Sequence, residues 1–296
     1  MPGGTTIGLR EAAERLGVHY MTAYRYVRSG RLDAHKVGNE WQVDEHELER
    51  LVAGPQRRGP DGEQTAPREV HRRRLERRVL AGDEAGAWGV VDAALASGAS
   101  PAEVLTEMVA PSLRSIGRRW ADGELSVADE HRASAVCQRL IARLGPRFSR
   151  PGRRRGTVVI GSIQGDRHTL PTAIMSDLLR GAGLEVVDLG ADCPPSSVLE
   201  TAAALDGPSV VGICITASEG LDEAPAYLAA LRAGGLGCPI VLGGGAVTDA
   251  ALAHRMGAEH WAGDPEGAVT LFVELAGHRG PDAGAERSAD ARGSDE

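Results

Sequence analysis

The stretch TVVIGSIQGDRHTLP, residues 157–171, decides the fold of the C-terminal half of this 296-residue chain. Its first seven residues are mostly apolar and rich in β-branched side chains, which is typical of a strand buried on both faces. Polar residues follow, and an amphipathic segment begins at about Pro171. The stretch therefore predicts a strand, a loop and the start of a helix in direct succession.

The same alternation of apolar runs and amphipathic segments continues toward the C-terminus. Further strands are predicted at 185–189, 210–216, 240–242 and, more weakly, 259–261, and helices at 172–182, 196–205, 221–233, 249–256 and 265–276. Strands that alternate with helices form a parallel sheet covered on both faces. We therefore expect a flavodoxin-like or Rossmann-like α/β domain over residues 156–277, with ligands at the loops after Ile163, Thr216 and Leu242.

Upstream of this domain the sequence changes character. Residues 1–53 form a compact unit, 54–68 have the Pro, Gly and charge content of a linker, and 69–148 show helical periodicity, enough for a four-helix bundle. Beyond the α/β domain, residues 278–296 lack large apolar side chains, so a disordered tail is expected. The expected fold class is multidomain, with α and α/β parts.

Composition argues against several classes of protein. No apolar run reaches the roughly 18 residues of a membrane span, and the first ten residues lack a signal-peptide pattern, so no membrane partner is expected. Four cysteines lie far apart without a CxxC pair, which argues against a zinc cluster or disulfide scaffold and favours the cytoplasm. The net charge of −8 argues against bulk nucleic-acid binding but leaves room for local basic patches.

Residues 9–51 contain two short predicted helices joined by a turn at Gly17, followed by a hairpin around Gly38. Two helices with a glycine turn are the signature of a helix-turn-helix, and the hairpin can serve as a wing. The side chains expected to reach DNA phosphates or base edges are Tyr20, Thr22, Arg25, Arg28 and Lys36. Tyr24 and Trp41 are expected in the core. A small helical interaction module is the alternative.

This unit resembles the winged helix-turn-helix of MerR and excisionase proteins. The matching residues are Ala12, Ala13, Leu16, Gly17, Val18, Thr22, Tyr24, Arg25, Gly30, Leu32, Ala34, Lys36, Gly38 and Trp41. The resemblance implies binding to double-stranded operator DNA. Because one unit contacts only a few base pairs, a homo-oligomer, dimer or tetramer, is expected. The arginine-rich stretch 57–78 either lies along phosphates or is a solvated charge run.

The loop after the first strand of the α/β domain carries Asp166 and His168. A carboxylate at this spacing can hold one ring nitrogen of the histidine, which makes the other nitrogen a better metal ligand. One histidine is too few for a zinc site, which needs three or four protein ligands. It is the right number for a metal whose other ligands come from a macrocycle.

This segment is similar to the B12-binding motif DxHxxG…SxL…GG, in which the histidine is the lower axial ligand of cobalt. The resemblance implies a cobalamin cofactor, with His168 as metal ligand and Asp166 beside it. Pro171 replaces the motif glycine, and its fixed φ leaves room for a shifted loop. The other cofactor-binding residues implied are Cys214, Thr216, Gly243, Gly244 and Gly245. A flavodoxin-like domain with another ligand, or none, is the alternative.

In the helical segment, Trp120 is followed after nine residues by Glu130 and His131. The ordinary interpretation is a core tryptophan and an exposed Glu–His pair. The spacing and the domain order also resemble those of cobalamin-dependent photoreceptor repressors related to CarH. That resemblance implies a helical cap in which Trp120 covers adenosylcobalamin and Glu130 and His131 line the pocket. Ala121 stands where light-responsive members have a histidine that binds cobalt after photolysis. Three alternatives follow: the photoproduct differs, His131 takes the place of that histidine, or the signal is cofactor level rather than light.

Together these features predict a regulator rather than an enzyme. We expect a transcriptional repressor whose oligomeric state and operator binding are controlled by adenosylcobalamin, with light as an optional signal. Two alternatives stay open: a corrinoid methyl carrier of a methyltransferase system, and a MerR-type regulator that senses haem or no cofactor. The fused helix-turn-helix argues against the methyl carrier, because a methyl shuttle docks on partner enzymes and has no use for an operator.

Overall fold

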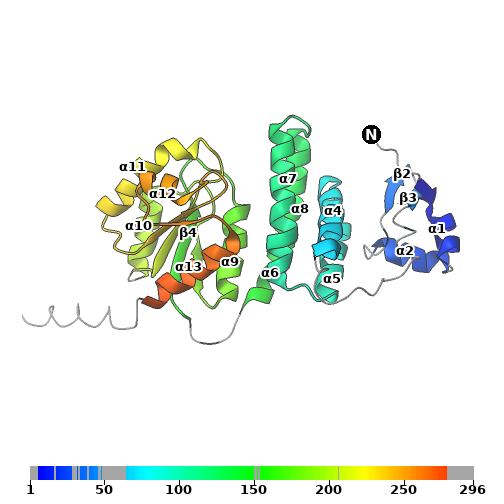
Figure 1. Cartoon of the computed structure of the whole chain (residues 1–296), viewed down its shortest axis with the longest axis horizontal. Coiled ribbons are helices and arrows are strands. Elements are labelled where there is room, and N and C mark those ends of the chain that lie inside the picture. The colour runs from blue at the N-terminus through cyan, green and yellow to red at the C-terminus, as the bar shows by residue number, and fades with distance from the viewer. Residues whose placement is uncertain are drawn as a thin grey trace, which may run out of the picture. The chain divides into compact units, whose positions relative to one another are not determined.

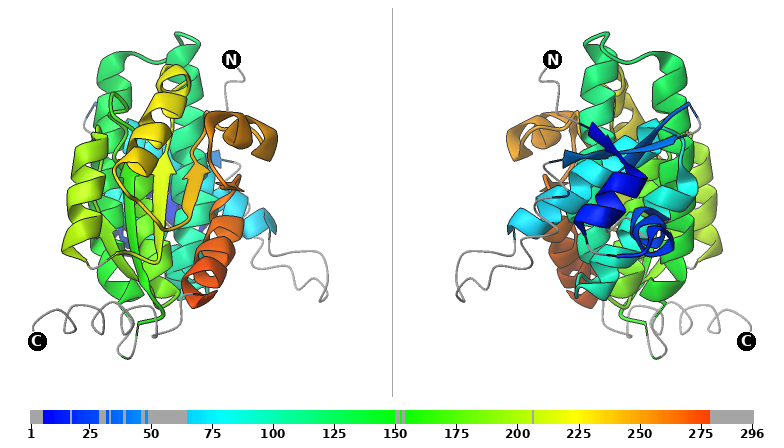
Figure 2. Two further views of the ribbon diagram at one scale, coloured as in Figure 1. Left: turned by 90° about the vertical axis from the view of Figure 1, so that its left-hand side faces the viewer. Right: turned by 90° about the vertical axis from the view of Figure 1, so that its right-hand side faces the viewer.

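The computed structural model describes residues 6–278 except 17, 29–31, 33, 39, 46–47, 49–64, 150–151, 153 and 206. The chain divides into two compact units, Met1–Leu144 and Gly145–Glu296, whose elements are labelled in Figure 1 and seen from two further sides in Figure 2. Residues 279–296 of the predicted tail, and most of the predicted linker, lie outside the described residues.

The first unit begins with a small domain of two helices and an antiparallel sheet. Its elements are β1 (Thr6–Gly8), α1 (Leu9–Arg15), α2 (Tyr20–Arg28), β2 (Ala34–Val37) and β3 (Glu40–Asp44), with strand order β1-β3-β2. The α1–α2 pair and the β2–β3 hairpin, with Gly38 at φ 63°, confirm the predicted helices and wing. Strand β1 is too short to be predicted from alternation. Tyr24 and Trp41 pack, partly buried, against the apolar core of this domain, as expected.

The rest of the first unit is a helical bundle. Its elements are α4 (Thr65–Leu80), α5 (Glu84–Ala96), α6 (Pro101–Glu103), the π-helical segment η1 (Val104–Val109), α7 (Ala110–Ala121) and α8 (Val127–Leu144). Helix α4 begins inside the segment 54–68, so the linker prediction is wrong over residues 65–68. Pro67 is typical of a linker, but proline is also tolerated in the first turn of a helix.

Elements α6, η1 and α7 follow one another without a break, so that they form one long helix. Ser100 begins it with a capping box, because its side chain accepts from the Glu103 amide and the Glu103 side chain accepts from the Ser100 amide. Pro111 cannot donate to the carbonyl four residues before it, and the helix has π geometry over the turn that precedes α7.

The second unit is an α/β domain with a five-stranded parallel sheet, which confirms the predicted fold class. After the 3₁₀ turn η2 (Gly145–Phe148) come β4 (Thr157–Ser162), α9 (Leu170–Gly181), β5 (Glu185–Asp188), α10 (Pro195–Ala204), β6 (Val210–Cys214), α11 (Gly220–Ala233), β7 (Ile240–Gly243), α12 (Ala250–Met256), β8 (His260–Ala262) and α13 (Pro265–His278). The strand order is β5-β4-β6-β7-β8. Residue 278, predicted as the start of the tail, is the end of α13.

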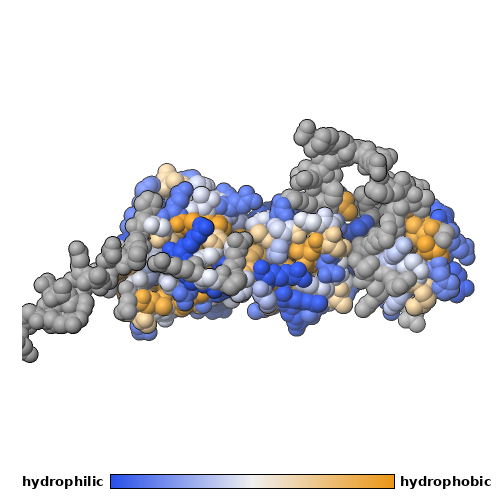
Figure 3. Space-filling model, turned by 90° about the horizontal axis from the view of Figure 1, so that it is seen from below, coloured by the Kyte–Doolittle hydropathy of each residue, from blue (hydrophilic) through white to orange (hydrophobic). Residues whose placement is uncertain are grey.

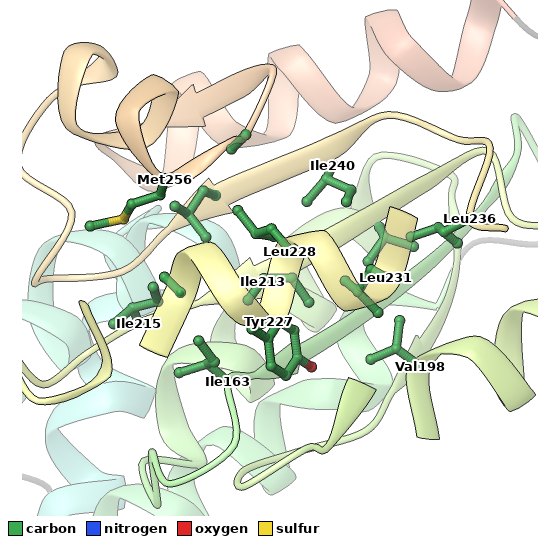
Figure 4. Packing of buried hydrophobic residues seen from close by; sticks show 14 of the residues in the cluster. Ile163, Val198, Ile213, Ile215, Tyr227, Leu228, Leu231, Leu236, Ile240 and Met256 are labelled. Atoms are coloured by element: carbon green, nitrogen blue, oxygen red, sulfur yellow. The ribbon is translucent and has the colours of Figure 1, made fainter. Parts of the chain in front are cut away.

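Each face of this sheet has its own apolar core. On one face, α10, α11 and α12 cover a cluster that includes Ile163, Tyr227 and Leu228 (Figure 4). On the other face, α9 and α13 cover a smaller cluster that includes Leu179 and Phe272. Because both faces are covered, the inner strands β4, β6 and β7 are mostly apolar and are recognisable in the sequence as short apolar runs. The edge strands β5 and β8 also carry polar residues.

In the described part of the chain, no helix combines the length and the apolar content needed to cross a bilayer. The face shown in Figure 3 mixes hydrophilic and hydrophobic residues over both units.

Candidate cofactor site

The predicted site residues of the second unit gather at the carboxyl edge of the parallel sheet. Strands β4 and β6 are neighbours, with Ser162 paired to Cys214, although β5 lies between them in sequence. The chain therefore reverses its direction of winding between β4 and β6, and in open α/β sheets ligands bind at such a switch point. The loops that carry Asp166 and Thr216 leave the sheet at this point, directly after β4 and β6.

Asp166 holds both its own loop and the loop after β6. One oxygen, Oδ1, lies 2.6 Å from His168 Nδ1 and accepts from the His168 backbone N–H at 3.0 Å. The other oxygen, Oδ2, accepts from the Thr216 backbone N–H at 2.6 Å. The Asp166 side chain is 1% exposed, whereas that of His168 is 54% exposed. The carboxylate is thus a buried anchor, and the imidazole reaches solvent.

These contacts decide the charge of Asp166. Burial raises the pKa of its carboxyl group, but hydrogen bonds from the His168 ring and from the amides of Thr216 and His168 outweigh burial and hold that pKa below its usual value. An ionised Asp166 accepts a hydrogen bond from His168 Nδ1, an assignment made from the hydrogen-bond geometry. In that tautomer the lone pair of the ring lies on Nε2, as a metal ligand requires.

The end of β6 adds two polar groups beside the carboxylate. The Cys214 sulfur lies 3.6 Å from the Thr216 hydroxyl. Burial raises the pKa of the Cys214 thiol to about 11, so the group is a neutral thiol at pH 7. Ser162, which no sequence motif singles out, is fully buried and donates to the His168 carbonyl at 3.0 Å. The sequence offers one indication of Ser162, which is a hydroxyl group at the end of a mostly apolar strand.

The three glycines at the end of β7, Gly243 to Gly245, differ in the space around them. Gly244 has φ 99°, and a Cβ there would lie 2.7 Å from the N and carbonyl C atoms of Ile215. Gly244 therefore makes room for the neighbouring backbone rather than for a ligand. A Cβ at Gly245 would meet nothing closer than 3.7 Å, and one at Gly243 would lie 3.3 Å from the Ala262 oxygen. Gly245, which is exposed, is the member with open space.

Pro171, the residue in place of the motif glycine, comes three positions after His168. It lies in the first turn of α9, directly after Leu170. Amide groups in the first turn of a helix have no partner within the helix, so a proline there loses no hydrogen bond. The replacement of the motif glycine is thus accommodated by the start of the helix.

Trp120, Glu130 and His131 lie in the first unit, near the turn between α7 and α8. Trp120 is 45% exposed, so its interpretation as a core residue is wrong. Glu130 lies 2.6 Å from His131 Nδ1 through Oε2 and accepts from the Ser134 hydroxyl through Oε1. The His131 side chain is largely exposed, and Ala121 is the exposed last residue of α7.

The predicted DNA-reading residues lie on α2 and on the wing. Tyr20 and Lys36 are exposed, and Thr22 is partly buried. The side chains of Arg25 and Arg28 lie outside the described residues. Two large apolar residues, Met21 on α2 and Val37 at the end of β2, are exposed as well.

Across the described residues, no group of three or more His, Cys, Asp or Glu side chains is arranged to hold a metal ion. The site at the switch point instead offers one imidazole with a carboxylate behind it. This donor set fits a metal that arrives with a macrocycle.

Comparisons with known proteins agree with this geometry. Models of a B12 binding domain match residues 71–144 and, separately, residues 156–272, and a helix-turn-helix domain model matches residues 7–54. The chain is 28% identical to the dimethylamine corrinoid protein of Methanosarcina barkeri over 59% of this chain and 83% of that protein. It is 31% identical to trimethylamine corrinoid protein 1 of Methanosarcina acetivorans, over 40% of this chain but only 57% of that protein.

A solved structure has the same fold. The monomethylamine corrinoid protein of Methanosarcina barkeri superimposes with a TM-score of 0.62 at 19% identity, covering 71% of this chain and all of that one. Over the matched residues the chain therefore shares the fold of that protein. The chain carries B12-binding domains, preceded by an N-terminal helix-turn-helix domain.

Proposed function

We propose that the chain is a DNA-binding transcriptional repressor whose oligomeric state and operator binding are controlled by adenosylcobalamin. The observation that carries the cobalamin part is the Asp166–His168 pair at the switch point of the sheet, 2.6 Å apart and with the ring exposed. The match of residues 7–54 to a helix-turn-helix domain supports the DNA-binding part. No residue of the chain is assigned a catalytic role.

The residues of the second unit have distinct roles in this proposal. His168 would bind the cobalt through Nε2, and Asp166 would fix the tautomer and the orientation of the His168 ring. Thr216 and Cys214 supply polar contacts to the nucleotide tail, and Gly245 gives that tail space. Adenosylcobalamin, when bound, supplies a cobalt–carbon bond that light can break.

In this proposal the exposed Trp120 would detect the cofactor. Its indole would cover the adenosyl group, and Glu130 and His131 would contact the same group. Because a single helix-turn-helix reads few base pairs, several copies held in one oligomer bind far more tightly than one. Without the adenosyl group the contact to Trp120 would be absent, and the oligomer would no longer hold DNA.

A second candidate function is that of a corrinoid methyl carrier. It is favoured by the names of the similar proteins, which are dimethylamine and trimethylamine corrinoid proteins. It leaves the helix-turn-helix without a role, which is why we rank it second. A regulator that senses haem, or no cofactor, is a further alternative that a spectrum distinguishes.

The decisive experiment loads the full-length protein with adenosylcobalamin in the dark, followed by desalting. We expect a stoichiometric cofactor spectrum, a larger oligomer and about 100-fold tighter binding to duplexes selected from a random library than for the cofactor-free protein. Absorbance, size-exclusion chromatography and binding at one fixed salt concentration measure these three properties. Illumination is expected to change the spectrum and to release the DNA.

The other outcomes assign the function differently. Cofactor-loaded protein that binds DNA but ignores light is a sensor of cofactor level. Loaded protein that exchanges methyl groups with a methyltransferase and selects no duplex is a methyl carrier. Protein that retains no cobalamin contradicts the cofactor assignment.

The substitution Trp120→Ala is expected to lower the preference for adenosylcobalamin over hydroxocobalamin by about tenfold, because a large aromatic face is lost from the upper ligand. The free energy of unfolding is expected to change by less than about 0.5 kcal/mol, since Trp120 is an exposed surface residue. The ratio of the two dissociation constants, measured in the dark, checks this. Val127→Ala, a change at another exposed apolar residue beside the same turn, is the matched control, and an unchanged ratio in Trp120→Ala contradicts the assignment.

A further inference from the structure

The loop between β5 and α10 contains an unusual backbone conformation. Asp192 has φ 53°, and no other non-glycine residue in the described part of the chain has a positive φ. Residues with a Cβ rarely adopt this left-handed region, although Asp and Asn tolerate it better than most. A structure holds such a residue in place when its surroundings require that conformation.

Two hydrogen bonds show what the conformation of Asp192 achieves. Its carboxylate oxygen Oδ1 accepts from the Gly165 backbone N–H at 2.7 Å. Its own backbone N–H donates to the Asp166 carbonyl at 2.8 Å. Asp192 therefore holds the ligand loop on both sides of Asp166, once through its side chain and once through its backbone.

The residue that follows Asp192 is fixed to the sheet and to the core. The Cys193 amide donates to the Ser162 carbonyl at 3.0 Å, and Cys193 forms a parallel bridge with Ile163. The Tyr227 hydroxyl donates to the Cys193 carbonyl at 2.9 Å from within the apolar cluster of Figure 4. Asp192 thus extends from a rigid anchor toward the loop that carries Asp166.

We infer that Asp192 is a positioning residue for the metal ligand His168. The inference rests on the proposed function, in which His168 binds cobalt. Asp192 fixes the backbone at residues 165 and 166, and Asp166 in turn holds the His168 ring at 2.6 Å. Because metal–ligand distances tolerate only about 0.2 Å, a looser loop lowers the fraction of cobalamin that is bound through the histidine.

Three substitutions separate the side-chain bond from the backbone conformation. Asp192→Asn keeps an acceptor oxygen and tolerates positive φ. Asp192→Gly adopts positive φ freely but has no acceptor. Asp192→Ala loses both. Asp249→Ala is the matched control, since it removes an aspartate that accepts from the Thr248 hydroxyl and from the Leu252 amide at the start of α12.

The readout is electron paramagnetic resonance of full-length protein loaded with cob(II)alamin and labelled with ¹⁵N-histidine. A histidine on cobalt splits the signal into doublets, whereas the nitrogen of the cofactor's own base gives triplets. We expect the ratio of histidine-bound to other forms to fall about tenfold in Asp192→Ala and Asp192→Gly, the loss of one hydrogen bond to a charged acceptor. Asp192→Asn and Asp249→Ala are expected to resemble the unsubstituted protein.

A second readout needs no cofactor. In the cofactor-free protein, the Gly165 amide is expected to exchange with solvent about tenfold faster in Asp192→Ala and Asp192→Gly than in the unsubstituted protein or Asp192→Asn. Faster exchange at this amide, together with the lower ratio, supports the inference.

The failures are distinguishable. If the unsubstituted protein binds cob(II)alamin without doublets, His168 is not the ligand, and the cobalamin part of the proposed function is overturned together with this inference. If it shows doublets and Asp192→Ala shows the same ratio, the positioning role alone is overturned. The positioning role is also overturned if Asp192→Gly behaves as the unsubstituted protein does, because the side-chain bond then has no effect.

Discussion

The substitution His168→Ala is expected to lower the affinity for cobalamin by about 100-fold or more while leaving the fold intact. Residues that only support a metal ligand typically contribute 10- to 100-fold in affinity, so loss of the ligand itself costs at least as much. The ring is 54% exposed and its removal opens no cavity in the core, so little stability is lost. Isothermal titration with hydroxocobalamin measures the affinity, and circular dichroism measures the fold.

Two further variants define the result for His168. His254→Ala removes an exposed histidine from the last turn of α12 and is expected to bind cobalamin normally. Asp166→Asn keeps His168 but holds its ring less firmly. The cobalamin affinity of this variant is expected to fall between those of His168→Ala and His254→Ala. An unchanged affinity and spectrum in His168→Ala would mean that another group, or none, occupies the lower face.

Much of the fold could be predicted from the sequence, because its signals are local. The inner strands of the α/β domain appear as short apolar runs, and β4 begins at Thr157, the residue expected. The Asp166–His168 pair could be predicted because the two residues are only two positions apart and directly follow a strand. Thr216 could be predicted near this pair as well, because parallel strands end at the same edge of a sheet, and its amide does donate to Asp166.

The remaining features depend on contacts between distant residues. Gly244 is required by the backbone of Ile215, and Asp192 matters because its side chain meets Gly165, 27 positions earlier. Ser162 was missed because a single hydroxyl in an apolar run carries no periodic signal. The linker was predicted too long because Pro67 is equally compatible with a linker and with the first turn of α4.

The substitution Gly244→Ala is expected to destabilise the α/β domain by about 2–5 kcal/mol, the sum of two costs. A residue with a Cβ at φ 99° pays the strain of the left-handed region, about 1–2 kcal/mol. The new methyl group would also lie 2.7 Å from the N and C atoms of Ile215, and backbone cannot give way as a flexible side chain does. Forcing such space typically costs about 1–3 kcal/mol.

The neighbouring glycine provides the control, because Gly245→Ala adds the same methyl group one position later. Gly245 does not have positive φ, and its Cβ would meet only the Thr216 oxygen, at an ordinary 3.7 Å. Its stability is therefore expected to change by less than about 0.5 kcal/mol. The urea dependence of amide hydrogen exchange in β6 and β7 measures the free energy of unfolding of this domain in both variants, independently of unfolding in the other domains. Equal stability of the two variants would show that the loops after β6 and β7 separate at little cost, and the carboxyl edge of the sheet would then be a mobile surface that closes only around its ligand.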